Sequence, residues 1–309
     1  MSKVLVFGHQ NPDMDTIGSA VAMSYLLNHT GYEAEAVALG TPNEEANYAL
    51  NYFELEAPRV IETAANEVTE VVLVDHNEAQ QSVSDLDKVS VKAVVDHHRI
   101  ANFKTADPLY YRAEPVGCTA TIILKLFKEK NVEIPREIAG VMVSAIISDT
   151  LLMKSPTCTV EDVTAAEELA QIADISLDVY GLEMLKAGTD ISDKSAIDIL
   201  NDDAKSFPMG DETVRIGQVN VVDLNDILVR KDELLEVMRE ETRLNEYGLC
   251  ILLVTDIIEN NSVAIVDGPA YRQFEMAFKK PIQMNTVELE GVVSRKKQVV
   301  PPLNAIFSK

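Results

Sequence analysis

Hydrophobic and polar positions alternate through the first third of the chain so that short apolar runs are separated by stretches of helical periodicity. The apolar runs predict strands at 4–7, 34–39, 71–74 and 91–95, and the periodic stretches predict helices at 16–28 and 43–53. Strands that alternate with helices indicate an α/β fold with a doubly wound, mainly parallel sheet.

Helical periodicity dominates the next part of the chain, from residue 117 to residue 186. We predict four helices there, at 119–130, 135–152, 160–173 and 177–186. The second of them is apolar on nearly every side, so we expect it to be buried. Pro135 suits the first position of that helix, where a missing N–H costs nothing.

The periodicity lapses at 189–194, where small and polar residues predominate. We place a hinge linker there, between an N-terminal domain over 1–188 and a C-terminal domain over 195–309. The pattern of the second domain predicts strands near 214–222, 250–255, 263–266 and 287–293, and one long charged helix over 225–246. We therefore expect a smaller α/β domain with a mixed sheet.

Three of the predicted strands end in acidic and imidazole side chains. The runs are His9-Gln10-Asn11-Pro12-Asp13-Met14-Asp15, Asp75-His76-Asn77 and Asp96-His97-His98, which together hold four of the five histidines. Parallel strands place the residues at their carboxyl ends around a common crevice. Neutral imidazole and carboxylate are the ligands of borderline divalent metals, so the pattern predicts a metal site.

These residues also have structural explanations. At the ends of the second and third of these strands, the Asp would hold a loop amide and the His would be partly exposed. Asp15 or Thr16 would serve as the N-cap of the helix that begins beside them. Capping uses only one side chain, however, and it leaves His9 and Asp13 unexplained. Asp149 follows a long apolar run, and from the residues alone it is more simply explained as a solvent-facing helix residue.

The charge of the candidate ligands bears on the number of metals. Four carboxylates would share one crevice if Asp13, Asp15, Asp75 and Asp149 all contribute. Adjacent carboxylates repel one another or take up protons, whereas two divalent cations cancel their charge. We therefore expect a two-metal centre, with ions about 3.5–4 Å apart, rather than a single tetrahedral zinc.

The composition limits the partners. The chain has 309 residues, a formal net charge of −23 and no Trp, and a surface that coats nucleic acid needs clustered cations. No apolar window approaches the roughly 20 residues of a membrane helix, and His9 comes too early for a signal peptide. Three scattered cysteines fit a reducing compartment. We expect a cytoplasmic protein with no nucleic-acid or membrane partner.

The motifs together resemble those of a known family. His9-x-x-x-Asp13-x-Asp15, the strand-end Asp75, Asp96-His97-His98 and the late Ser294-Arg295-Lys296-Lys297 resemble the family II inorganic pyrophosphatases, the manganese-dependent branch of the DHH phosphoesterase superfamily. The likeness extends to length, motif order, motif spacing and two-domain layout. The basic C-terminal run and the position of Lys205 narrow it to the pyrophosphatases.

The resemblance implies a ligand set for each metal. One ion would be held by His9, Asp13 and Asp75, and the other by Asp15, Asp75, His97 and Asp149. Asp75 is then a bridge between the two ions. Asp149 becomes a ligand, which reverses the simpler explanation from the residues alone.

The resemblance also implies roles outside the metal ligands. His98 would touch or protonate a phosphate oxygen, and Asp96 would orient an imidazole. The implied cofactors are Mn2+ or Co2+, two per subunit, with Mg2+ arriving alongside the substrate. Residues 1–188 would be a DHH-type catalytic domain, through which a homodimer forms, and 195–309 a substrate-binding domain.

The basic residues near the C-terminus have two explanations. Alone, Lys205 and the run 295–297 would be solvated surface. In a chain of net charge −23 such a run is unusual, and the resemblance assigns Lys205, Arg295 and Lys296 to pyrophosphate. In a regular strand Arg295 and Lys296 would face opposite ways, so we expect irregular backbone there.

These residues lead us to expect hydrolysis of pyrophosphate to two orthophosphates, by in-line attack of a metal-bridging hydroxide as the hinge closes over substrate. One alternative is a DHH-type phosphodiesterase or exopolyphosphatase acting on short oligonucleotides or polyphosphate. The phosphodiesterases carry a glycine-rich C-terminal motif that ends in histidine, and this chain has no Gly-Gly pair and no histidine after His98. Another is a non-catalytic metal or nucleotide sensor, for which the chain offers no appended module.

Overall fold

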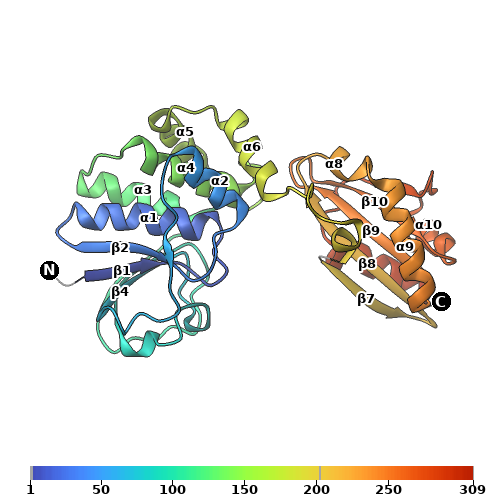
Figure 1. Ribbon diagram of the computed structural model, residues 1–309, viewed down its shortest axis with the longest axis horizontal. Coiled ribbons are helices and arrows are strands. Elements are labelled where there is room, and N and C mark those ends of the chain that lie inside the picture. The colour runs from blue at the N-terminus through green and yellow to red at the C-terminus, as the bar shows by residue number, and fades with distance from the viewer. Residues whose placement is uncertain (1–2, 202, 309) are drawn as a thin grey trace. The chain divides into compact units, whose positions relative to one another are not determined.

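The computed structural model describes residues 3–201 and 203–308 (Figure 1). The chain divides into two compact units, Met1–Gly188 and Thr189–Lys309. The division falls at the first residue of the expected linker.

The first unit is built on a sheet of six strands that all run parallel. Its strands are β1 (Lys3–Phe7), β2 (Glu33–Ala38), β3 (Arg59–Val60), β4 (Glu70–Val74), β5 (Ser90–Asp96) and β6 (Tyr110–Ala113), in the order β3-β2-β1-β4-β5-β6. The order reverses between β1 and β4, as in doubly wound folds, and ligands bind outside the strand ends at such a reversal. The expected fold class is confirmed, while β3 and β6 were not predicted.

Helices of the first unit gather on one side of the labelled strands in Figure 1. They are α1 (Met14–Asn28), α2 (Glu44–Tyr52), α3 (Thr119–Lys130), α4 (Arg136–Thr150), α5 (Val160–Ala173) and α6 (Leu177–Gly188). All residues from Ile138 to Ile147 in α4 are buried, as its apolar pattern predicts. Two short 3₁₀ segments, η1 (Ala79–Gln81) and η2 (Leu86–Lys88), follow β4. Val83 and Val91 pack with Leu5, Phe7 and Leu73 in a hydrophobic cluster that includes this part of the chain.

Three local predictions are wrong. The N-cap of α1 is Asp13, whose side chain accepts from the Thr16 N–H at 3.0 Å, rather than Asp15 or Thr16. Pro135 is itself the N-cap of α4, in an extended conformation, rather than its first helical residue. The long helix expected at 225–246 is divided into α8 (Asn225–Leu228) and α9 (Lys231–Asn245). Arg230 lies at the break, and its Nη1 donates to the carbonyls of Ile191 and Lys194 at 3.4 and 2.8 Å.

The second unit contains a mixed sheet of five strands, as expected. Its strands are β7 (Ala204–Met209), β8 (Glu212–Val221), β9 (Leu249–Asp256), β10 (Asn261–Asp267) and β11 (Thr286–Leu289), in the order β11-β10-β9-β8-β7. Only the pair β8 and β9 is parallel among these neighbours. The remaining elements are α7 (Ala196–Asn201), α10 (Tyr271–Phe278), the π-helix η3 (Arg295–Val299) and α11 (Val300–Phe307).

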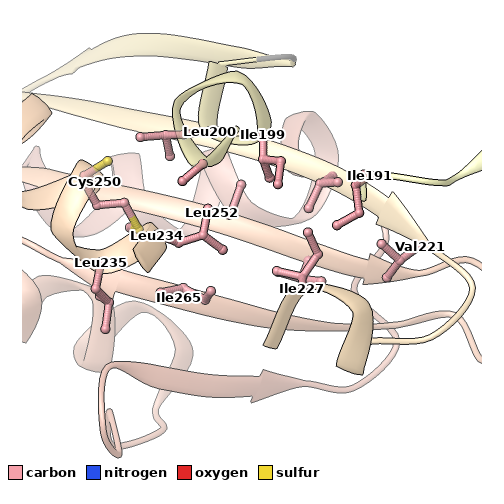
Figure 2. Packing of buried hydrophobic residues seen from close by; sticks show 14 residues of the cluster. Ile191, Ile199, Leu200, Val221, Ile227, Leu234, Leu235, Cys250, Leu252 and Ile265 are labelled. Carbon is pink, nitrogen blue, oxygen red and sulfur yellow. The ribbon is translucent and has the colours of Figure 1, made fainter. Parts of the chain in front are cut away.

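The central strand β9 is buried along its whole length because hydrophobic side chains cover both faces of the sheet. Cys250 and Leu252 point into the cluster that includes residues of α7, α8 and α9 (Figure 2). Leu249, Ile251 and Leu253 join the opposite cluster, with residues of α10 and α11. This explains why 250–255 reads as a continuous apolar run.

Part of the expected linker packs on the second unit. Ile191 is 6% exposed and belongs to the same cluster as Leu252 (Figure 2). The contacts from Arg230 hold the carbonyls of Ile191 and Lys194. Residues 191–194 are therefore tied to the unit that follows them.

Among the described residues, no helix combines the length and the apolar character needed to cross a membrane. The cysteines Cys118, Cys158 and Cys250 are free thiols.

Candidate metal centre

The carboxyl ends of three neighbouring strands carry the predicted metal ligands. His9 follows β1, Asp75 follows β4 and His97 follows β5, and β1, β4 and β5 lie side by side in the sheet. Three groups of ligand atoms lie within 4.8 Å of one another: His9, Asp13 and Asp75; Asp15, His97 and Asp149; and Asp75, His97 and His98. The structure thus brings together all six residues that we expected to hold metal.

Asp75 lies at the middle of this cluster, and each of its carboxylate oxygens faces a different imidazole. Oδ2 lies 3.5 Å from His9 Nε2, and Oδ1 lies 3.5 Å from His97 Nε2. The backbone of Asp75 is left-handed, with φ of 57°, a conformation that Asp tolerates better than most residues. Its N–H donates to the Val95 carbonyl at 2.9 Å. This local geometry turns the carboxylate toward both imidazoles.

Backbone carbonyls fix the orientation of the two imidazoles. His9 Nδ1 lies 2.8 Å from the Gln10 carbonyl, and His97 Nδ1 lies 3.0 Å from the Val116 carbonyl. In the neutral ring Nδ1 then donates its hydrogen, and the Nε2 lone pair faces the carboxylates. This arrangement is typical of histidines that bind metal.

Hydroxyl groups hold the Asp75 carboxylate from two helices. Thr16 Oγ1 of α1 donates to Oδ2 at 2.9 Å, and Thr119 Oγ1 of α3 donates to Oδ1 at 3.2 Å. Gly8 makes room for Thr16, because a Cβ at position 8 would lie 2.5 Å from the Thr16 methyl carbon. Asp15 is held in a similar way, by Ser19 Oγ at 2.6 Å and by the Thr119 N–H at 2.7 Å.

The electrostatics of the cluster fit a centre for divalent cations. Burial, and then the negative charge of Asp15, raise the pKa of Asp75 to about 7. The same two causes raise the pKa of Asp149 well above its usual range. Burial lowers the pKa of His97, but the hydrogen bond with Asp75 and the charge of Asp15 outweigh it, and the pKa rises to about 9. Buried carboxylates at this spacing need bound cations or protons, and the mixed imidazole and carboxylate donors suit borderline metals.

Asp96 holds His98 at the edge of the cluster. The buried Asp96 Oδ1 lies 3.0 Å from His98 Nδ1 and also accepts from the His98 N–H at 3.0 Å. Asn77 Nδ2 donates to Asp96 Oδ2 at 2.6 Å. The His98 side chain is 52% exposed, so one face of the imidazole is open to solvent. A cavity of about 470 Å³ adjoins it and is lined by polar side chains that include Gln80 and Arg99.

The basic residues that we expected to bind substrate lie in the second unit. Lys205 is exposed on β7, where it pairs with Ile216 of β8. Arg295 Nη1 donates to the Ile216 carbonyl at 3.2 Å and to the Asp203 carbonyl, and Nη2 donates to Asp203 Oδ1 at 2.7 Å. Lys296 is exposed. The backbone leaves the strand pattern before Ser294 and enters the π-helix η3 at Arg295, which confirms the predicted irregularity.

Comparison with known proteins places this chain in a family. Residues 3–146 match the model of the DHH family N-terminal domain, and residues 182–306 match the model of the DHHA2 domain. The "Probable manganese-dependent inorganic pyrophosphatase" of Enterococcus faecalis is 60% identical over 308 residues, which is 100% of both chains. The "Manganese-dependent inorganic pyrophosphatase" of Bacillus subtilis is 56% identical over 98% of both chains. The chain belongs to the manganese-dependent inorganic pyrophosphatase family.

A solved structure of the pyrophosphatase family has the same fold. It is described as "Methanococcus jannaschii putative family II inorganic pyrophosphatase" and is 38% identical to this chain, with a TM-score of 0.64. The matched region covers 99% of this chain and 100% of the chain in the solved structure. The family resemblance drawn from the motifs is therefore confirmed.

The motifs of this pyrophosphatase family member did not reveal the residues that support the metal ligands. Thr16 was considered only as a helix cap, and nothing in the sequence pointed to Thr119 or Ser19. Thr119 lies 104 residues from Asp15 along the chain and 44 residues from Asp75. No local pattern encodes contacts of that range. His76, although it belongs to one of the three runs, is buried and joins none of the ligand groups found among the described residues.

Proposed function

We propose that this chain is a manganese-dependent inorganic pyrophosphatase that hydrolyses pyrophosphate to two orthophosphates. The observation that carries the proposal is the geometry of Asp75, whose two oxygens face the imidazoles of His9 and His97. It occurs in a chain that is 56% identical to the Bacillus subtilis enzyme of that name.

Two metal ions per subunit are part of the proposal. His9, Asp13 and Asp75 would hold one ion, and Asp15, Asp75, His97 and Asp149 the other. Mn2+ or Co2+ suits this donor set, and Mg2+ would arrive with the substrate. When bound, such ions lower the pKa of water and offset the charge of phosphate oxygens. The ligand groups of the metal centre support this assignment.

His98 is proposed as the catalytic residue that contacts a phosphate oxygen. Asp96 engages Nδ1, so Nε2 is the nitrogen left to donate to the substrate. The exposure of the imidazole supports this role, because a residue that binds substrate must be reachable. Asp96 keeps the ring from rotating away from that orientation.

Lys205, Arg295 and Lys296 are proposed to bind pyrophosphate. Lysine ammonium groups provide mobile point charges for phosphate oxygens, and Arg provides a planar fork. The bonds to Asp203 and Ile216 account for three of the five guanidinium N–H groups of Arg295, so this residue is also an anchor of its own unit. We keep 189–194 as the hinge linker between the catalytic domain 1–188 and the substrate-binding domain 195–309, although its residues 191–194 pack on the second unit.

The assembly and the location are likewise proposals. The family resemblance supports a homodimer that forms through residues 1–188. The net charge of −23 supports the absence of a nucleic-acid partner. Free cysteines are in keeping with a cytoplasmic location.

Phosphate release from metal-stripped protein tests the proposal. Pyrophosphate, tripolyphosphate and a dinucleotide are each supplied with Mn2+, Mg2+ or Zn2+, and we expect the fastest release from pyrophosphate with Mn2+. An Asp75→Asn variant should be inactive, whereas Asp87→Asn, a control at an exposed acid of η2, should match the wild type. A preference for the dinucleotide would indicate a phosphodiesterase instead, and release from tripolyphosphate alone would indicate an exopolyphosphatase.

A further inference from the structure

The basic loop, residues 291–298, carries Arg295 and Lys296 and is held by side chains instead of by a neighbouring strand. Side chains accept from the N–H groups of Gly291 (Asn261 Oδ1), Val293 and Ser294 (Gln298 Oε1), Arg295 (Gln218 Oε1) and Lys297 (Ser294 Oγ). Side chains donate to the carbonyls of Gly291 (Gln298 Nε2), Val292 (Ser262 Oγ) and Val293 (Gln218 Nε2). Three of these side chains, Gln218, Asn261 and Ser262, belong to strands of the sheet. The sheet therefore determines where the basic loop lies.

Gln218 holds the peptide groups on both sides of Ser294. Its Nε2 donates to the Val293 carbonyl at 3.1 Å, and its Oε1 accepts from the Arg295 N–H at 3.1 Å. A carboxamide side chain carries a donor and an acceptor side by side, so it can hold two peptide groups at once. One side chain therefore fixes the backbone immediately before Lys296.

A row of polar side chains crosses the sheet beneath this contact. Gln218 of β8 donates to Thr255 Oγ1 of β9 at 3.1 Å, and Thr255 Oγ1 lies 2.9 Å from Ser262 Oγ of β10. Ser262 Oγ in turn donates to the Val292 carbonyl at 2.6 Å. Thr255 and Ser262 are each 2% exposed. Buried hydroxyls are costly unless they are hydrogen-bonded, and this row satisfies them while its two ends meet the basic loop.

The same part of the chain separates an anchored cation from an exposed one. Arg295 is 8% exposed, and its guanidinium is bonded to Asp203 and Ile216. Lys296, the next residue, is exposed. A lysine side chain is flexible, so the position of its Cα limits which points its ammonium can reach. Gln218 acts on that position through the backbone of Arg295.

We propose that Gln218 is a positioning residue that sets the approach of Lys296 to pyrophosphate. The inference rests on the proposed function, because it takes Lys296 to bind the substrate. Gln218 touches neither substrate nor metal in this role, and it works by holding the Val293 and Arg295 peptide groups. The alternative is that Gln218 only stabilises the sheet. If Gln218 positions Lys296, the effect of replacing Gln218 on kcat/KM depends on whether Lys296 is present. If Gln218 only stabilises the sheet, that effect is the same with and without Lys296.

A double-mutant cycle separates these roles. Gln218→Leu removes the carboxamide with little change in size, and we expect kcat/KM for pyrophosphate to fall roughly 10-fold, mainly through KM, because small misplacements of a binding group weaken catalysis strongly. In a Lys296→Ala background the same substitution should change kcat/KM less than about 2-fold, since the residue being positioned is gone. Gln273→Leu, at a glutamine of α10 for which the structure gives no side-chain bond, is the matched control and should behave as the wild type.

Four results decide the matter. An equal loss from Gln218→Leu in both backgrounds would overturn the positioning role, and so would wild-type kinetics for Gln218→Leu alongside an impaired Lys296→Ala. Pyrophosphatase activity that is absent from the wild type would instead overturn the proposed function. If Gln218→Leu does not fold, Ser262→Ala replaces it, because within the basic loop it releases only the Val292 carbonyl, together with the Thr255 hydroxyl of the neighbouring strand. Ser262→Ala should lower kcat/KM about 2- to 5-fold in the wild type and not in Lys296→Ala, and a loss of equal size in both would overturn the inference.

Discussion

Replacing Thr16 by Val should weaken Mn2+ binding while leaving the fold intact. Val has nearly the shape of Thr, so the contact with Gly8 is kept and only the hydroxyl is lost. That hydroxyl donates to Asp75 Oδ2 at 2.9 Å, and Asp75 is 1% exposed, so water cannot easily take its place. A hydrogen bond to a charged group contributes about 1.5–3 kcal/mol. At 1.4 kcal/mol for each tenfold change, the Kd for Mn2+ should rise about 10- to 100-fold.

Isothermal titration calorimetry, in which Mn2+ is added to metal-stripped protein, measures this change in Kd. Thr16→Ser should restore most of the affinity because it restores the donor. Thr164→Val, whose hydroxyl donates to the Val160 carbonyl within α5 at 3.0 Å, serves as a control that removes a hydroxyl far from Asp75 in sequence. If the Kd of Thr16→Val for Mn2+ is within twofold of the wild-type Kd, the hydroxyl does not support Asp75 and the reasoning is refuted.

Three further predictions concern the metal centre. Asp75→Ala should lose both ions, because both proposed ligand sets include this carboxylate, and elemental analysis that still finds two ions would contradict its proposed bridging position. His98→Gln should hydrolyse pyrophosphate about 10²- to 10⁴-fold more slowly while retaining Mn2+; loss of Mn2+ affinity would make His98 a ligand. Mn2+ binding at pH 7 should release protons, because the metal-free pKa values of His9 and His97 are about 9, so both imidazoles must lose a proton to bind. Affinity should therefore weaken as the pH falls. Calorimetry in two buffers of different ionisation enthalpy counts the protons, and a count near zero would refute the assignment.

All the candidate ligands except Asp149 could be predicted because they belong to short motifs that follow a strand end. Parallel strands bring such ends together wherever the neighbours lie in the sheet, so His9, Asp75 and His97 needed only the strand pattern. Asp149 was different, because its apolar helix gave no reason to turn it toward the cluster. Its place depended on how α4 packs, and the family resemblance supplied it where the pattern did not.

Strand β6 and the break between α8 and α9 were missed for two different reasons. The strand β6 is only four residues long and none of its residues is buried, so it lacks the apolar run that marks a strand in the sequence. The break between α8 and α9 lies at Arg230, whose bonds reach residues 36 and 39 positions earlier. The periodicity of a sequence gives information only about residues that are close together on a helix. It therefore does not predict contacts with residues so far away along the chain.

The sequence by itself determined the parallel sheet and the chemistry at its strand ends, because each follows from residue types within a few positions of one another. The irregular backbone at Arg295 followed from the family resemblance, which assigns Arg295 and Lys296 to one substrate. The tertiary structure decided how those groups are aimed. Thr119 reaches Asp75 from another helix, and Gln218 holds the peptide groups around Ser294 from another strand. Such hydrogen bonds exist only after the elements have packed, and that packing gives a cluster of acids and imidazoles the geometry of a metal centre.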